Sequence, residues 1–118
     1  MRPSKSTVLV VEDEKESRET LCELLELEGY QVQTAANGRE ALDALSVNGD
    51  QICIVLLDLF MPVMDGWQVI DQLRADGRLA TTNIVIITSA PHRAPAGMPI
   101  FAKPLDLDKV MNAVQRLC

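Results

Sequence analysis

The strongest constraint on the fold is the alternation of short apolar runs with segments of helical periodicity. Three of the runs are almost continuously apolar, as in strands that are covered on both faces, whereas Tyr30–Thr34 alternates with period two and resembles an edge strand. Strands that alternate with helices predict a parallel sheet with helices on both faces. The predicted strands are Thr7–Val11, Tyr30–Thr34, Ile52–Leu57, Ile84–Ile87 and Ile100–Ala102.

Four helices are predicted between and after these strands. The first three span Glu14–Glu28, Arg39–Val47 and Gly66–Ala75, and Asp106 is the predicted cap of the last. Gly29 is the predicted end of the first helix, and Asn37-Gly38 is predicted to form a turn. The residues expected to face the sheet are Leu21, Leu24, Leu25, Ala41, Leu42, Leu45, Val69, Ile70, Leu73, Leu107, Val110, Val114 and Leu117.

One segment breaks the alternation, between the fourth and fifth predicted strands. A fourth helix is due there, but the segment carries Pro91, Pro95 and Pro99 together with Gly97. Proline lacks the backbone donor and clashes with the preceding turn, so at most one helical turn is expected. The helix due between the fourth and fifth strands, which would be the fourth helix of a (βα)5 pattern, is therefore predicted to be shortened or missing, and the helix capped by Asp106 would be the last.

Length and charge limit the possible functions. The 118 residues are expected to form a single domain over 1–118, with no output domain. A formal net charge of −6 argues against nucleic acid and against an anionic membrane as partners, because both attract basic proteins. No apolar run approaches the roughly 18 residues that a membrane-spanning helix needs.

The cysteines Cys22, Cys53 and Cys118 show no metal-ligand spacing. Cys53 lies inside an apolar run, where a cysteine usually acts as a small core residue. An odd number of unpatterned cysteines favours a reducing compartment over a disulfide framework, so a cytoplasmic location is expected.

Polar residues follow four of the predicted strands: Glu12-Asp13, Asp58, Thr88 and Lys103. The carboxyl ends of parallel strands share one edge of the sheet, which is where such folds bind ligands. Carboxylates suit Mg²⁺, an aspartate can accept a phosphoryl group, and a lysine can neutralise phosphoryl charge. Each residue also has an ordinary alternative: a helix cap for Asp13, a loop hydroxyl for Thr88 and a solvated lysine for Lys103.

With these residues in place, the chain resembles the receiver domains of bacterial two-component response regulators. The matching segments are Glu12-Asp13, Asp58-Leu-Phe-Met-Pro62 with Asp65-Gly66, Thr88, and Phe101-Ala-Lys-Pro104. The resemblance covers essentially the whole chain. It implies a flavodoxin-like (βα)5 fold, an α/β doubly wound five-stranded parallel sheet with strand order 2-1-3-4-5.

The resemblance also implies a metal and phosphate site. Asp58 matches the phosphoryl acceptor, and Asp13 matches a direct Mg²⁺ ligand. Glu12 matches the acidic neighbour that often holds the metal through water. The backbone carbonyl of Phe60 matches a further ligand.

The remaining matches concern signalling. Thr88 matches the hydroxyl that moves toward the phosphate, and Lys103 matches the lysine that pairs with it. The bond from Lys103 to Pro104 is commonly cis in the family. Phe101 matches the aromatic switch residue, although as phenylalanine it has no ring hydroxyl.

We therefore expect a phosphoprotein of a two-component phosphorelay. A histidine kinase or phosphotransfer protein would supply the phosphoryl group, and an unknown downstream protein would read the switched surface. The chain would be no enzyme beyond self-catalysed aspartyl phosphorylation and dephosphorylation. Two alternatives remain open: a phosphorylation-independent interaction module of the same fold, and a metal-dependent phosphatase, whose second aspartate is replaced here by Phe60.

The connection before the fifth strand departs from the family. It is shorter than usual by roughly one to two helical turns. Ala96-Gly97-Met98-Pro99 replaces the usual Gly-Ala-(Asp/Asn)-Asp motif. Any output surface is therefore expected to differ from the usual helix-four face.

Overall fold

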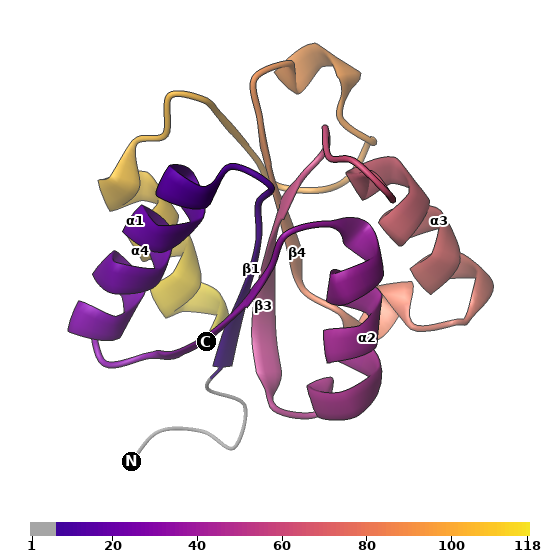
Figure 1. Cartoon of the computed structure of the whole chain (residues 1–118), viewed down its shortest axis with the longest axis horizontal. Helices are drawn as coiled ribbons and strands as arrows, with labels where there is room; N and C mark the ends of the chain where they lie inside the picture. Colours follow the sequence, from indigo (N-terminus) through magenta and orange to yellow (C-terminus); the bar gives the residue numbers. More distant parts are fainter. Residues whose placement is uncertain (1–6) are drawn as a thin grey trace.

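The computed structural model describes residues 7–118, which form one five-stranded parallel sheet flanked by helices (Figure 1). The strand order is β2-β1-β3-β4-β5, as expected. The strands are β1 (Thr7–Val11), β2 (Gln31–Ala35), β3 (Ile52–Asp58), β4 (Ile84–Thr88) and β5 (Ile100–Ala102). Every residue of β3 is buried, which explains why this strand is apolar up to Asp58.

Helices α1 (Lys15–Leu27) and α4 (Leu107–Leu117) cover one face of the sheet, and α2 (Gly38–Asn48) and α3 (Gly66–Ala75) cover the other (Figure 1). On the first face, α1 and α4 pack against Val8, Val10 and the alternate residues of β3 and β4. Leu9 and Val11 point to the second face because successive strand residues alternate sides.

The predicted elements agree with the observed ones to within one or two residues, with two local corrections. Leu107, expected to face the sheet, is 37% exposed because it begins α4 before the helix turns inward at Val110. Asn37-Gly38 is no free turn, since the Asn37 side chain accepts the Glu40 backbone N–H and caps α2. Asn and Gly favour both settings, so the dipeptide alone does not distinguish them.

The connection between β4 and β5 contains no α-helix, as predicted, and the helix labelled α4 follows β5. Among residues 89–99, all of them described, the only helical segment is the single 3₁₀ turn η2 (Pro91–Arg93). Ala94 and Met98 pack on the core in place of the missing helix. Their cover stops short of the sheet edge, where Ile100 remains 38% exposed.

The structure corrects the expectation of unpaired cysteines, because Cys53 and Cys118 form a disulfide. Cys53 is the second residue of the buried β3, and Cys118 follows α4, so the bond ties the end of that helix to the sheet. Cys53 is buried as predicted. The cysteine spacing gave no sign of the pair, because 65 positions separate the two residues along the chain.

The disulfide has a measurable consequence for thiol reactivity. We expect the native oxidised chain to react with a maleimide only at Cys22, the free cysteine. That reaction should be slow near neutral pH and quicken as pH rises, because burial and the neighbouring Glu26 and Glu23 raise the pKa of the Cys22 thiol. Mass spectrometry should find one adduct on the native chain and three after reduction and unfolding.

A Cys118→Ser variant tests the same pairing. It should lower the free energy of unfolding by roughly 2–4 kcal/mol, the range for closing a long loop, and oxidised and reduced wild type should differ by as much. Identical denaturation midpoints for wild type with and without reductant would show that the bond does not form.

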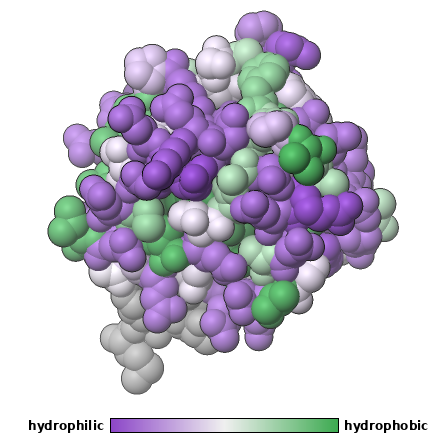
Figure 2. Space-filling model, in the orientation of Figure 1, coloured by the Kyte–Doolittle hydropathy of each residue, from purple (hydrophilic) through white to green (hydrophobic). Residues whose placement is uncertain are grey.

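The surface is ordinary for a chain of this charge. Hydrophilic side chains dominate the face shown in Figure 2, and hydrophobic ones lie in small separate groups. Over residues 7–118, no helix is long and apolar enough to cross a membrane.

Candidate functional site

The polar residues predicted from the sequence gather at the carboxyl edge of the sheet, the upper edge in Figure 1. Asp58 ends β3 and Thr88 ends β4, while Glu12 and Lys103 directly follow β1 and β5. The parallel register aligns these ends, with Val11 opposite Leu57 and Asp58 opposite Ile87. Four strands far apart in sequence thus converge on one site.

Asp58 is the last residue of β3, so its carboxylate lies at the carboxyl end of that buried strand. It is 4% exposed, and its Oδ1 accepts the backbone N–H of Phe60 at 3.4 Å. The start of α3 comes close behind it, since a Cβ on Gly66 would lie 2.5 Å from the Asp58 carbonyl oxygen. Local structure therefore explains the Asp65-Gly66 pair. Asp65 forms a capping box with Gln68 at the start of α3, and Gly66 lets α3 approach the Asp58 backbone closely.

Lys103 bridges the two buried carboxylates. Its Nζ lies 2.7 Å from Glu12 Oε2 and 3.2 Å from Asp58 Oδ2. Burial raises the pKa of Glu12; the Lys103 hydrogen bond opposes this shift, and the charge of Asp58 adds to it. Burial alone would lower the pKa of Lys103, but its bonds and proximity to Glu12 and Asp58 raise it overall, so the ammonium stays charged.

Glu12, Asp13 and Asp58 make a cluster suited to a hard cation. One carboxylate oxygen from each lies within 4.8 Å of the others. Asp13 is exposed and does not cap α1, because the N-cap position is Glu14, where no side chain accepts a backbone N–H of the helix. Hard oxygen donors on a partly open site fit Mg²⁺, which retains several waters.

The other predicted residues lie around this cluster. Thr88 is fully buried, and its hydroxyl oxygen accepts the Ala90 backbone N–H at 3.0 Å. Phe101 is half-buried against the α1–α4 side of the sheet. Phe60 is 39% exposed, and the Lys103–Pro104 peptide bond is cis.

Arg18 also supports the site, although no motif in the sequence singles it out. From the second turn of α1, its Nη1 donates to the backbone carbonyls of Glu12 at 2.8 Å and Asp13 at 3.3 Å. The guanidinium therefore fixes the loop that carries both acids. A basic residue one turn into the helix after an acidic strand end is the only sequence signal, and it is a common pattern.

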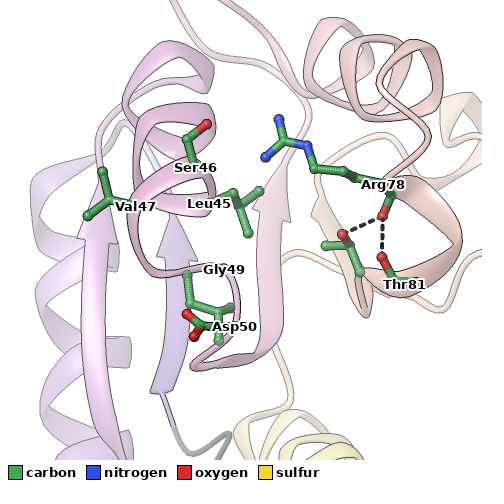
Figure 3. Close-up of a pocket in the computed structure, with 9 residues that line it drawn as sticks. Leu45, Ser46, Val47, Gly49, Asp50, Arg78 and Thr81 are labelled. Atoms are coloured by element: carbon green, nitrogen blue, oxygen red, sulfur yellow. Dashed lines mark hydrogen bonds between the residues drawn. The ribbon is translucent and has the colours of Figure 1, made fainter.

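A separate pocket of about 450 Å³ lies at the other end of the sheet, near the start of β3 (Figure 3). The Arg78 backbone carbonyl accepts the hydroxyls of Thr81 and Thr82 there. Ser46 and Asp50 also line it, but within the described chain the cluster of three carboxylates lies at the opposite edge. The acidic edge is therefore the candidate site.

Comparison with known proteins agrees with this geometry. The family model of the response regulator receiver domain matches residues 8–115. Sporulation initiation phosphotransferase F of Bacillus subtilis is 31% identical over 116 residues, covering 92% of this chain and 90% of that protein. Transcriptional regulatory protein PcoR of Escherichia coli is 41% identical over 115 residues, covering 93% of this chain and 50% of its own length.

Solved structures show the same fold. Response regulator TrrA of Thermotoga maritima, in complex with Mg²⁺ and BeF, has a TM-score of 0.82 and 30% identity, with 96% of this chain and 99% of that chain covered. The receiver domain of the hybrid histidine kinase CckA has a TM-score of 0.80 and 31% identity, with coverages of 94% and 97%. The chain belongs to the receiver domains of two-component response regulators.

The relatives differ in length. The chain spans 49% of the response regulator MprA of Mycolicibacterium vanbaalenii and 50% of PcoR, but 90% of the sporulation protein. Receiver domains therefore occur in this group both nearly alone and as about half of a longer regulator.

Proposed function

We propose that this receiver takes a phosphoryl group from a phosphohistidine of a histidine kinase or phosphotransfer protein onto Asp58, and thereby switches a surface read by another protein. The observation that carries the proposal is the pairing of the buried Asp58 carboxylate with Lys103 beside a cluster of carboxylates. Family membership supplies the class of reaction. The proposed transfer and the proposed switch follow from the chemistry of these side chains.

In the proposed transfer, a carboxylate oxygen of Asp58 attacks the phosphorus, and the bond from phosphorus to the donor imidazole breaks. The electron pair of that bond stays on the imidazole nitrogen. Bound Mg²⁺ would offset charge on the phosphoryl oxygens, held by Asp13, Asp58 and the Phe60 carbonyl, with Glu12 acting through water. Lys103 supplies a second positive charge from the side of β5.

The proposed switch begins with added charge. An aspartyl phosphate carries roughly −1.5 to −2 charges on generic phosphate values, which draws Lys103 and the Thr88 hydroxyl toward it. Thr88 would then donate to a phosphoryl oxygen, and the Ala90 N–H would lose its present acceptor. Phe101, one strand away, would repack as Thr88 moves.

A groove beside the site suits the incoming donor protein. It runs between the first turns of α1 and the loop after β5, and it reaches Glu12 and Lys103. Leu21, Leu105 and Leu107 give it an apolar wall. A helix that carries the phosphohistidine can lie there with its imidazole toward Asp58. Beyond its own phosphorylation and dephosphorylation, we propose no enzymatic activity.

The second candidate is an interaction module that does not use phosphate. The lack of an α-helix between β4 and β5 favours this second candidate, because the usual switch surface is altered. A scaffold alone would not require Glu12, Asp13, Asp58, Thr88 and Lys103 at the same edge. Incubation with acetyl phosphate and Mg²⁺, followed by intact-mass measurement, distinguishes the two, since the module takes no phosphate.

Metal binding gives a separate test. Asp13→Ala should weaken Mg²⁺ binding by about tenfold or more, because it removes both a ligand and a charge from a small cluster. Calorimetry of the phosphate-free protein measures the affinity. Asp43→Ala, an exposed acid on α2, is the matched control and should bind as wild type does. Equal Mg²⁺ affinity in the Asp13 variant would place the metal elsewhere.

A further inference from the structure

Phe60, Trp67 and Arg93 form a compact group beside the acceptor, here called the aromatic clasp. The two rings meet edge to face, with centroids 5.1 Å apart and planes at 80°. The Arg93 guanidinium carbon lies 5.3 Å from each ring centroid. The Trp67 Nε1–H donates to the Arg93 backbone oxygen at 3.2 Å. One arginine thus binds both rings through its cation and one of them through its carbonyl.

The clasp joins two loops that border Asp58. Phe60 belongs to the loop after β3, and Trp67 lies in the first turn of α3. Arg93 ends the 3₁₀ turn η2 in the connection between β4 and β5. The clasp therefore fixes the separation of these two loops on the side of the site where the connection between β4 and β5 lacks an α-helix.

Each end of the clasp also connects to the reacting group. The Phe60 N–H donates to Asp58 Oδ1 at 3.4 Å. At the other end, the Arg93 N–H donates to the Ala90 carbonyl at 3.0 Å, and the Ala90 N–H donates to the Thr88 hydroxyl oxygen at 3.0 Å. A path of direct contacts thus runs from Thr88 through Arg93 to Phe60 and Asp58.

Few other contacts hold this connection in place. Pro91, Pro95 and Pro99 have no backbone donor, and Arg93 itself is solvent-exposed. Ala94 and Met98 anchor the far part of the segment on the core. The clasp adds side-chain contacts at Arg93, which lies closer to Thr88 along the chain than either of these anchors.

We propose that the clasp restricts the access of water to the phosphoryl group on Asp58, with Arg93 as a positioning residue that sets the phosphoryl lifetime. The inference rests on the proposed function. In hydrolysis, a water oxygen attacks the phosphorus, the bond from phosphorus to the Asp58 oxygen breaks, and its electron pair returns to the carboxylate. The water gives its proton to solvent, and inorganic phosphate leaves. Loops held together leave less room for that water in line with the breaking bond.

The test measures how fast phosphate is lost. Wild type, Arg93→Ala, Arg93→Lys and the control Arg78→Ala are phosphorylated with acetyl phosphate and Mg²⁺, freed of donor, and followed by intact mass. Arg78 is a fair control because it lies at the opposite pocket, paired with Asp76 (Figure 3). Arg93→Ala should lose phosphate about threefold or more faster, as expected when a partly exposed cation–π contact is removed. Arg93→Lys, which keeps a cation over the rings, should stay near wild type.

A second readout separates positioning from general destabilisation. Trp67 is the only tryptophan, so its emission reports on the clasp. Arg93→Ala should shift that emission before phosphorylation, without changing the unfolding midpoint enough to populate unfolded chains. Arg78→Ala should leave the emission unchanged.

The outcomes distinguish the two proposals. If wild type takes phosphate and Arg93→Ala loses it at the same rate, the clasp proposal is wrong and the proposed function stands. Equal acceleration in Arg78→Ala or in Arg93→Lys also overturns the clasp proposal. A wild-type chain that takes no phosphate overturns the proposed function and the inference with it.

Discussion

Asp58→Asn should keep the fold and take no phosphate. The change removes the nucleophilic carboxylate with almost no change of volume, and the Phe60 N–H still finds an oxygen acceptor. It also removes one of two close negative charges in the buried pair with Glu12, so stability should not fall much. After incubation with acetyl phosphate and Mg²⁺, intact-mass spectrometry should show one phosphate on wild type and none on the variant.

A matched substitution elsewhere on the chain controls this result. Asp71→Asn alters an exposed aspartate of α3 that pairs with Arg74, away from the acidic cluster. Asp71→Asn should take up one phosphate from acetyl phosphate, as wild type does. If Asp58→Asn labels as fully as Asp71→Asn, then Asp58 is not the acceptor and the assignment fails.

Lys103→Met should retain some phosphorylation but lose the conformational response. Its ammonium contacts both Glu12 and Asp58, and methionine keeps most of the stem while removing the charge. Two buried carboxylates would then lack their cation, which should cost about 1–3 kcal/mol of stability before protonation of Glu12 relieves part of it. Added Mg²⁺ should restore part of this loss by supplying positive charge.

Amide chemical shifts across residues 88–101 measure the response. In wild type they should change when a phosphate mimic such as beryllofluoride is added with Mg²⁺, and in Lys103→Met they should change far less. Lys109→Met, an exposed lysine of α4, is the control and should respond fully. An undiminished response in the Lys103 variant would assign the sensing of phosphate charge to another group.

The lack of an α-helix between β4 and β5 affects how such a conformational response could reach a partner protein. In this chain the Thr88 hydroxyl is linked to η2 rather than to the start of a helix. Ala94 and Met98 cover β4, and the edge strand β5 keeps Ile100 exposed. We propose that a change at Thr88 would move this short proline-rich segment, and that the output surface therefore differs from that of receivers with a full helix there.

Local sequence patterns were enough to predict the strands, most helix ends and the group of polar residues at the strand ends. Those features depend on local periodicity, on capping residues and on the cost of burying an unpaired carboxylate, which predicted Asp58 at the end of β3. Parallel pairing then brings Glu12, Thr88 and Lys103 to the same edge without further information. The prolines after Thr88 were likewise enough to exclude a full fourth helix.

Tertiary structure alone decided which side chains meet. Cys53 and Cys118 lie 65 positions apart, and Trp67 and Arg93 lie 26 apart, with no periodicity that relates either pair. Arg18 reaches the Glu12 carbonyl across the loop that joins β1 to α1, and no motif in the sequence indicates that bond. Leu107 was misplaced because the first turn of α4 still points to solvent. Contacts of this kind depend on how helices sit on the sheet, and local sequence patterns do not encode that placement.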